Sequence, residues 1–139
     1  MNRTVNSYKD LEVWQRSMKL VTSIYGITKL FPKEELYALT NQVRRSAISI
    51  PSNIAEGRSK KSTRDFMRFI SIAYGSTAEL ETQLMIGNNL GYITFQKLDP
   101  ILKELNQIAR MLNGLSSGLE KKLKPASQIP ECRSLNPNL

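Results

Sequence analysis

Apolar residues recur at steps of three and four along most of the chain, and this spacing most constrains the fold. Steps of three and four return to one face of an α-helix, whereas a half-buried strand alternates apolar and polar residues. Four segments show the helical period, and no segment shows the alternation of a strand. The sequence therefore predicts an all-α protein.

Two of these segments open with a helix N-cap signature. Ser7 is followed three residues later by Asp10, and Ser62 is followed three residues later by Asp65. In such a pair the hydroxyl caps a free backbone N–H while the acid lies in the first turn, where the helix dipole favours negative charge. These signatures predict the starts of the first and third helices.

Proline and glycine residues mark the other helix boundaries. Pro32 disfavours helical geometry in the residue before it, and Gly57 is a natural C-cap. Pro51 falls inside the second segment, so we expect a kink there, or a stop and restart. The fourth helix begins between Thr94 and Pro100. We expect helices over about 8–30, 33–57, 62–88 and 95–121.

Helices of this length that are joined by short connections pack as antiparallel neighbours. The sequence thus predicts an up-down-up-down four-helix bundle, which forms a single domain over residues 1–124. Residues 125–139 hold several prolines and no periodicity, which predicts a flexible C-terminal tail.

The first helix carries two apolar series where a core-facing helix needs one. Five residues, Leu11, Trp14, Met18, Val21 and Tyr25, are the expected core series. The second series comprises Val13, Leu20, Ile24, Ile27 and Phe31, and its first four residues are the predicted subunit interface. The alternative is that this helix lies deep between two neighbours of its own bundle.

The third helix has a face of small residues opposite its apolar residues, which we call the small face. It consists of Ser71, Gly75, Ala78 and Thr82. A glycine inside a helix costs about 1 kcal/mol relative to alanine, so close approach of another helix would explain Gly75. We expect this face to take part in self-association; the alternative is a tolerated solvent-exposed face.

The residues needed for catalysis are scarce. Histidine is absent, Cys132 is the single cysteine, and no glycine loop matches a phosphate-binding motif. These absences argue against general-base catalysis, histidine metal sites and nucleotide-hydrolysing folds. We expect no catalytic residue, no metal and no cofactor.

No apolar run approaches the roughly 18 residues of a membrane span, and the expected location is the cytoplasm.

Positive charge is the main functional signal. Twenty Lys and Arg residues against 12 Asp and Glu give a net charge of +8. Much of the excess lies between residues 44 and 68, where Glu56 and Asp65 are the only acids. The predicted nucleic-acid-binding residues are Arg44, Arg45, Arg58, Lys60, Lys61, Arg64 and Arg68. Lys121, Lys122 and Lys124 form a second, flexible basic patch.

Clustered positive charge without an RNA-recognition or zinc-finger signature favours contacts with phosphates and little reading of bases. The leading hypothesis is a non-enzymatic, oligomeric accessory protein that binds RNA or DNA. One alternative is an interaction scaffold for an acidic protein partner. The other is that the charges are simply a solvated end of a helical hairpin.

Five segments resemble the family named after the 23S rRNA intervening-sequence protein. They are Tyr8–Trp14 (YKDLEVW), Phe31–Tyr37 (FPKEELY), Ser49–Gly57 (SIPSNIAEG), Ala73–Glu81 (AYGSTAELE) and Arg110–Leu115 (RMLNGL). The resemblance covers about residues 7–120 in order, and the proline-to-glycine segment is its most distinctive part.

The resemblance implies a bacterial four-helix bundle that assembles as a ring-like homopentamer. Some members are encoded within insertions in 23S rRNA genes, and related accessory proteins of diversity-generating retroelements engage a reverse transcriptase and nucleic acid. A reverse transcriptase is therefore one implied protein partner. On this resemblance Asn53 and Glu56 have structural roles near Pro51. The family has no known catalytic activity.

Overall fold

The computed structural model describes residues 7–123, and these residues form four α-helices. The helices are α1 (Glu12–Thr28), α2 (Leu39–Arg58), α3 (Thr63–Asn89) and α4 (Phe95–Leu123), with short 3-10 turns η1 (Tyr8–Asp10) and η2 (Lys33–Glu35). No strand occurs among the described residues, so the predicted all-α class with four helices is confirmed. The predicted tail, 125–139, lies outside the described residues.

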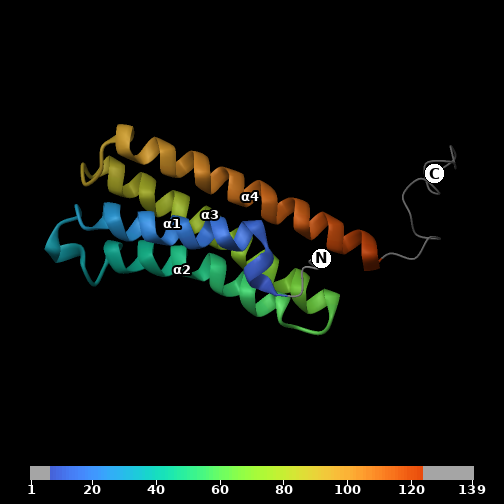
Figure 1. The fold of residues 1–139 in the computed structure, drawn as a ribbon. Helices are drawn as coiled ribbons and strands as arrows, with labels where there is room; N and C mark the ends of the chain where they lie inside the picture. The colour runs from blue at the N-terminus through green and yellow to red at the C-terminus, as the bar shows by residue number, and fades with distance from the viewer. Residues whose placement is uncertain (1–6, 124–139) are drawn as a thin grey trace, which may run out of the picture.

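Each helix packs on the next one along the chain, and α1 also contacts α4. The chain reverses direction at each connection, so the α2–α3 turn and the last residues of α4 lie at the same end of the molecule (Figure 1). The α1–α2 and α3–α4 connections lie at the opposite end (Figure 1). None of the helices within residues 7–123 is both long and apolar enough to cross a bilayer.

The core is a continuous cluster of aliphatic side chains from all four helices. Its fully buried members include Ile24, Ile50, Ile54, Leu80, Leu84, Leu105, Ile108 and Leu112. Burying one such side chain contributes about 1.5–3 kcal/mol. All of these except Ile24, which lies in the first segment, come from the second, third and fourth segments.

The two apolar series of α1 are exchanged relative to the prediction. Val13, Leu20 and Ile24 are only 5%, 2% and 0% exposed inside the chain's own core, and Ile27 packs partly buried against that core. A second subunit cannot reach Val13, Leu20 or Ile24 without unpacking the helices. These three residues belong to the core, as the alternative interpretation held, and the part of Ile27 in a subunit interface stays a prediction.

The other series of α1 lies nearer the surface. Met18 is 44% exposed and Tyr25 is 38% exposed, while Trp14 and Val21 pack partly buried against the core. The helical period identified both series correctly, but it carries no information about which one faces the neighbouring helices.

The first two helices are shorter than predicted because residues with non-helical backbone conformations, Leu11 and Ala38, interrupt them. Ser7 caps η1 through a 3.2 Å hydrogen bond from the Lys9 N–H, and the extended Leu11 then separates η1 from α1. In place of a helix from residue 33, η2 is followed by a break at Ala38. Tyr92 donates its hydroxyl to Glu35 at 3.1 Å, which fixes η2 against the α3–α4 connection.

Gly57 serves helix packing and is not the predicted C-cap. Helix α2 continues to Arg58, and a Cβ atom on Gly57 would lie 2.7 Å from Cβ of Phe69 on α3. Because Phe69 Cβ is fixed to the backbone, α2 and α3 can approach this closely only where α2 has no side chain. Gly91, with φ of 81°, is the glycine that ends a helix, since it follows α3 in a left-handed conformation.

Helix α2 runs through Pro51 without interruption, so the expected stop and restart does not occur. The Asn53 amide donates to the backbone oxygen of Ser49 at 2.7 Å and to its hydroxyl at 2.9 Å. The Ser49 hydroxyl in turn lies 2.7 Å from that of Ser76 on α3. Asn53 thus braces the turn around Pro51 and links it to α3, whereas Glu56 is exposed.

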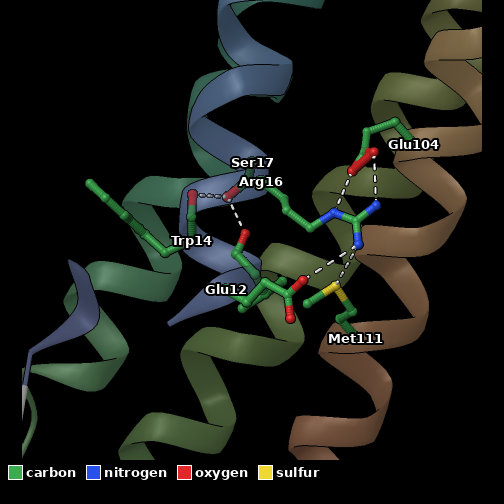
Figure 2. Close-up of polar contacts among 7 residues, drawn as sticks. Glu12, Trp14, Arg16, Ser17, Glu104 and Met111 are labelled. Carbon is green, nitrogen blue, oxygen red and sulfur yellow. Dashed lines mark hydrogen bonds and ion pairs between the residues drawn. The ribbon is translucent and has the colours of Figure 1, made fainter. Parts of the chain in front are cut away.

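A bidentate ion pair between Arg16 and Glu104 joins α1 to α4 (Figure 2). Nε of Arg16 donates to Glu104 at 2.7 Å and Nη2 donates to the second carboxylate oxygen at 2.9 Å. The sulfur of Met111 and the carboxylate of Glu12 also lie near the guanidinium, at 3.9 and 3.8 Å. The hydrogen bonds from Arg16 lower the pKa of Glu104, so this carboxylate has a structural partner and stays ionised at neutral pH.

We predict opposite effects of alanine at two helical glycines. Gly57→Ala should lower the free energy of unfolding by about 1–3 kcal/mol, because its Cβ would overpack against Phe69. Gly118→Ala, where a Cβ meets nothing within 4 Å, should raise it by up to about 1 kcal/mol. Urea denaturation at one fixed protein concentration measures both. Equal effects at the two positions would contradict the packing role of Gly57.

We also predict that the Arg16–Glu104 pair loses its contribution in acid. The pKa of Glu104 is lower in the folded chain than its ordinary value of 4.5, so the pair stabilises the fold above that pH. Its contribution disappears as the pH falls through the folded-state pKa. The difference in urea midpoint between the wild type and Glu104→Gln should be largest near pH 7 and shrink towards pH 3. A difference that does not change with pH would contradict this.

Candidate nucleic-acid interface

Five of the seven predicted basic residues come together at the α2–α3 turn. Arg58 is the last residue of α2, Lys60 and Lys61 lie in the turn, and Arg64 and Arg68 occupy the first two turns of α3. Lys60, Lys61, Arg64 and Arg68 are exposed. The close approach of α2 and α3 at Gly57 holds these residues on one end of the molecule.

Arg44 and Arg45 lie elsewhere, so the structure divides the predicted set. Fourteen residues of helix separate Arg44 from Arg58, a distance of about 21 Å along the axis. Arg44 is also engaged within the chain, because its Nε donates to the Thr28 hydroxyl at 2.9 Å and its guanidinium lies 4.5 Å from the centre of the Tyr25 ring. These contacts give Arg44 a role in joining α2 to α1.

Lys60 and Arg68 converge on one aromatic ring. The Arg68 guanidinium lies 4.5 Å and the Lys60 ammonium 5.4 Å from the centre of the Phe69 ring. Arg68 also lies 3.7 Å from Asp65, and both side chains are at least half exposed. This exposed pair contributes little to stability, although it offsets part of the repulsion expected between Arg64 and Arg68.

A hollow of about 390 Å³ opens beside these residues, and we call it the end hollow. It is lined by Leu11, Arg58, Lys60, Lys61, Ser62, Thr63, Phe66, Leu115, Leu119 and Lys122. Its lining includes the start of α3, where the Ser62 hydroxyl accepts a hydrogen bond from the Asp65 N–H at 3.0 Å. This N-cap is the one predicted from the sequence.

Lys122 of α4 lines the same hollow as Arg58, Lys60 and Lys61. Lys122 is helical and belongs to this cluster, so its predicted place in a separate flexible patch is wrong. The predicted antiparallel order of the helices was the signal that could have placed it, since that order brings the end of the fourth helix to the turn between the second and third. Lys124 lies outside the described residues.

The arrangement suits the binding of an anion. Four cationic side chains surround the end hollow, and the positive end of the α3 dipole lies in the same wall. Residues 7–123 contain no group of three or more Cys, Asp or Glu side chains placed to hold a metal ion. We call Arg58, Lys60, Lys61, Arg64, Arg68 and Lys122 together the basic end.

The predicted small face of α3 is exposed at all four of its positions. A Cβ atom on Gly75 would meet nothing within 4 Å, so no contact inside the chain requires this glycine. The involvement of the small face in self-association stays a prediction.

Comparison with known proteins identifies the relatives of this chain. The model of the family described as 23S rRNA-intervening sequence protein matches residues 9–114. A crystal structure from Bacteroides thetaiotaomicron VPI-5482, described as a protein with unknown function from the S23 ribosomal protein family, has a TM-score of 0.70 and 25% sequence identity. The similarity covers 75% of this chain and 97% of that one. No curated protein matches this chain. Because the family match spans most of the four-helix region, this chain belongs to the 23S rRNA-intervening sequence protein family.

Proposed function

We propose that this chain is a non-enzymatic, cytoplasmic, up-down-up-down bundle that self-associates and binds the phosphate backbone of RNA or DNA through its basic end. The observation that carries the proposal is the convergence on one hollow of cationic side chains from the end of α2, the α2–α3 turn and the end of α4. Among them, the exposed ammonium groups of Lys60, Lys61 and Lys122 repel one another.

A polyanion relieves this repulsion, and the net charge of +8 attracts one over a longer range. Contacts with phosphates displace condensed counterions, so binding by this mechanism weakens steeply as salt is added. The two exposed arginines one turn apart on α3, Arg64 and Arg68, extend the cationic surface beyond the hollow. A strand that enters the hollow can therefore continue along the start of α3.

Charge reversal on α3 tests the site. The double variant Arg64→Glu/Arg68→Glu should bind a labelled RNA or DNA at least tenfold more weakly than the wild type, because it replaces two phosphate contacts with two repulsive charges. The slope of log affinity against log salt should become shallower by about two. Fluorescence anisotropy over a salt series measures both quantities, and circular dichroism checks that the helices remain.

The matched control is Lys33→Glu/Lys97→Glu, which makes the same change in charge at the opposite end of the molecule. This control should lose affinity only slightly, through the long-range charge effect. Equal losses in the two double variants would show that net charge matters and the basic end does not. Unchanged binding in the Arg64 and Arg68 variant would remove these residues from the site, and an acidic protein partner would become the leading hypothesis.

Self-association has a candidate surface on α1 and α2, which we call the α1–α2 groove. It encloses about 320 Å³ and is lined by Tyr8, Trp14, Met18, Val21, Ile48, Pro51, Ser52 and Ala55. Met18 and Ile48 are 44% and 39% exposed, and the exposure of these apolar side chains to water is unfavourable for a monomer. Exposed apolar groups of this kind on adjacent helices favour a protein contact.

The α1–α2 groove and the small face of α3 are different surfaces. If the groove of one subunit receives the small face of the next, the contact is heterologous, and such contacts form a ring when the rotation between successive subunits closes. Gly75 would then allow the backbones of two subunits to approach closely. A ring agrees with the homopentamer that the family resemblance implies.

A charge in the groove should separate the subunits. Ile48→Asp should shift the protein from an oligomer to a monomer in size-exclusion chromatography with light scattering, because the interface would bury an unpaired carboxylate. Leu30→Asp changes a side chain that is 53% exposed and lies outside the groove, and it should leave the mass unchanged. A wild type that is already monomeric, or an Ile48→Asp variant that stays assembled, would contradict the proposed interface.

A further inference from the structure

The end hollow has an apolar side as well as a cationic one. Its apolar side chains are Leu11, Phe66, Leu115 and Leu119. Its cationic side chains are Arg58, Lys60, Lys61 and Lys122. Inorganic phosphate would use only the cationic side. A ligand that satisfies the whole hollow has an anionic group and an apolar group joined within one small molecule or one chain unit. Among the apolar side chains Phe66 carries a ring, on which a flat apolar group can stack.

The anionic group has a defined place at the start of α3. Thr63 is the first residue of α3 and lines the hollow. The first N–H groups of a helix have no acceptor within it, and the Ser62 hydroxyl satisfies the N–H of Asp65. The N–H group of Thr63 therefore remains for a ligand in the hollow, beside the ammonium groups of Lys60, Lys61 and Lys122. This combination matches a phosphate.

The flat group has a place against Phe66. This residue lies one turn into α3 and is partly buried, packed against the core, so its ring is held by the fold. An aromatic ring beside a cationic groove is the arrangement with which proteins bind single-stranded nucleic acids, since every base has a π-face that can stack. The volume of about 390 Å³ lies within the roughly 300–1,000 Å³ range of small-ligand sites.

We propose that the end hollow holds one unpaired nucleotide, with its phosphate at the start of α3 and among the lysines and its base against Phe66. This proposal rests on the proposed function, because it places one nucleotide of a bound strand. A base in a duplex must leave its stack to reach Phe66, whereas a base in a single strand is already accessible. The protein therefore prefers a single strand or an unpaired end to a continuous duplex.

The first experiment uses the unmodified full chain. Fluorescence anisotropy compares a labelled 12-nucleotide single strand with the matched blunt duplex, and unlabelled competitors are then added. The single strand should bind about tenfold more tightly than the duplex. A nucleoside monophosphate should displace it at a lower concentration than ribose 5-phosphate, which has the phosphate and sugar but no base.

Two pairs of variants test the contributions of the apolar side and the cationic side of the hollow separately. Phe66→Leu should reduce the preference for the single strand to less than about threefold. The control is Phe95→Leu, which changes a 60% exposed ring at the other end of α4 and should leave the preference unchanged. Lys122→Gln should weaken both nucleic acids more than Lys97→Gln, which removes the same charge from the first turn of α4. If Phe66→Leu fails to fold by circular dichroism, the competition with ribose 5-phosphate in the wild type decides.

The outcomes distinguish this inference from the proposed function. Equal affinity for single strand and duplex, with equal competition by the two phosphates, would overturn the nucleotide site while leaving phosphate-backbone binding intact. Absence of binding to both nucleic acids at low salt would overturn the proposed function. The nucleotide site would be supported if the nucleoside monophosphate no longer displaced the labelled single strand from Phe66→Leu but still displaced it from Phe95→Leu.

Discussion

The close contact between α2 and α3 at Gly57 is the constraint on which the basic end depends. A Cβ at this position would lie 2.7 Å from Cβ of Phe69, so the two helices meet here with almost no side chain between them. Their contact is the most extensive between any two elements among the described residues. The tight turn that follows places Lys60 and Lys61 beside the first turns of α3, where Arg64 and Arg68 project. The same contact leaves the Phe69 ring in reach of both Lys60 and Arg68.

The charges at this end arise from topology as much as from local sequence. Because the chain reverses at each connection, Lys122 returns to the hollow that Arg58 and Lys61 also line, more than sixty residues earlier in the chain (Figure 1). Charge repulsion at this end is tolerated because the ammonium groups are exposed to water and each long side chain can extend away from the others. The fold therefore holds cations around a partly apolar hollow, and the proposed binding of a nucleic acid rests on this combination.

The sequence predicts the helices well because helical period and capping are local properties. The period of the apolar residues identified all four helices, and the hydroxyl of Ser62 caps α3 as its spacing from Asp65 indicated. The contacts between helices could not be predicted from the sequence in the same way. The period could not show that Ile24 faces the core and Met18 the surface. Proximity in sequence grouped Arg44 with Arg58, although Arg44 contacts Thr28 and Tyr25 on α1. Gly57 was interpreted as a helix end because nothing local reveals Phe69 beside it.

The proposed binding of nucleic acid through several phosphate contacts requires a wild-type affinity that depends strongly on salt. The measurement is fluorescence anisotropy of the purified full chain with a structured RNA and a matched DNA duplex from about 50 to 200 mM salt. We expect measurable affinity at low salt and a steep linear fall of log affinity with log salt, with a slope that corresponds to several displaced counterions. Negligible binding at the lowest salt, or an affinity that does not change with salt, would contradict it.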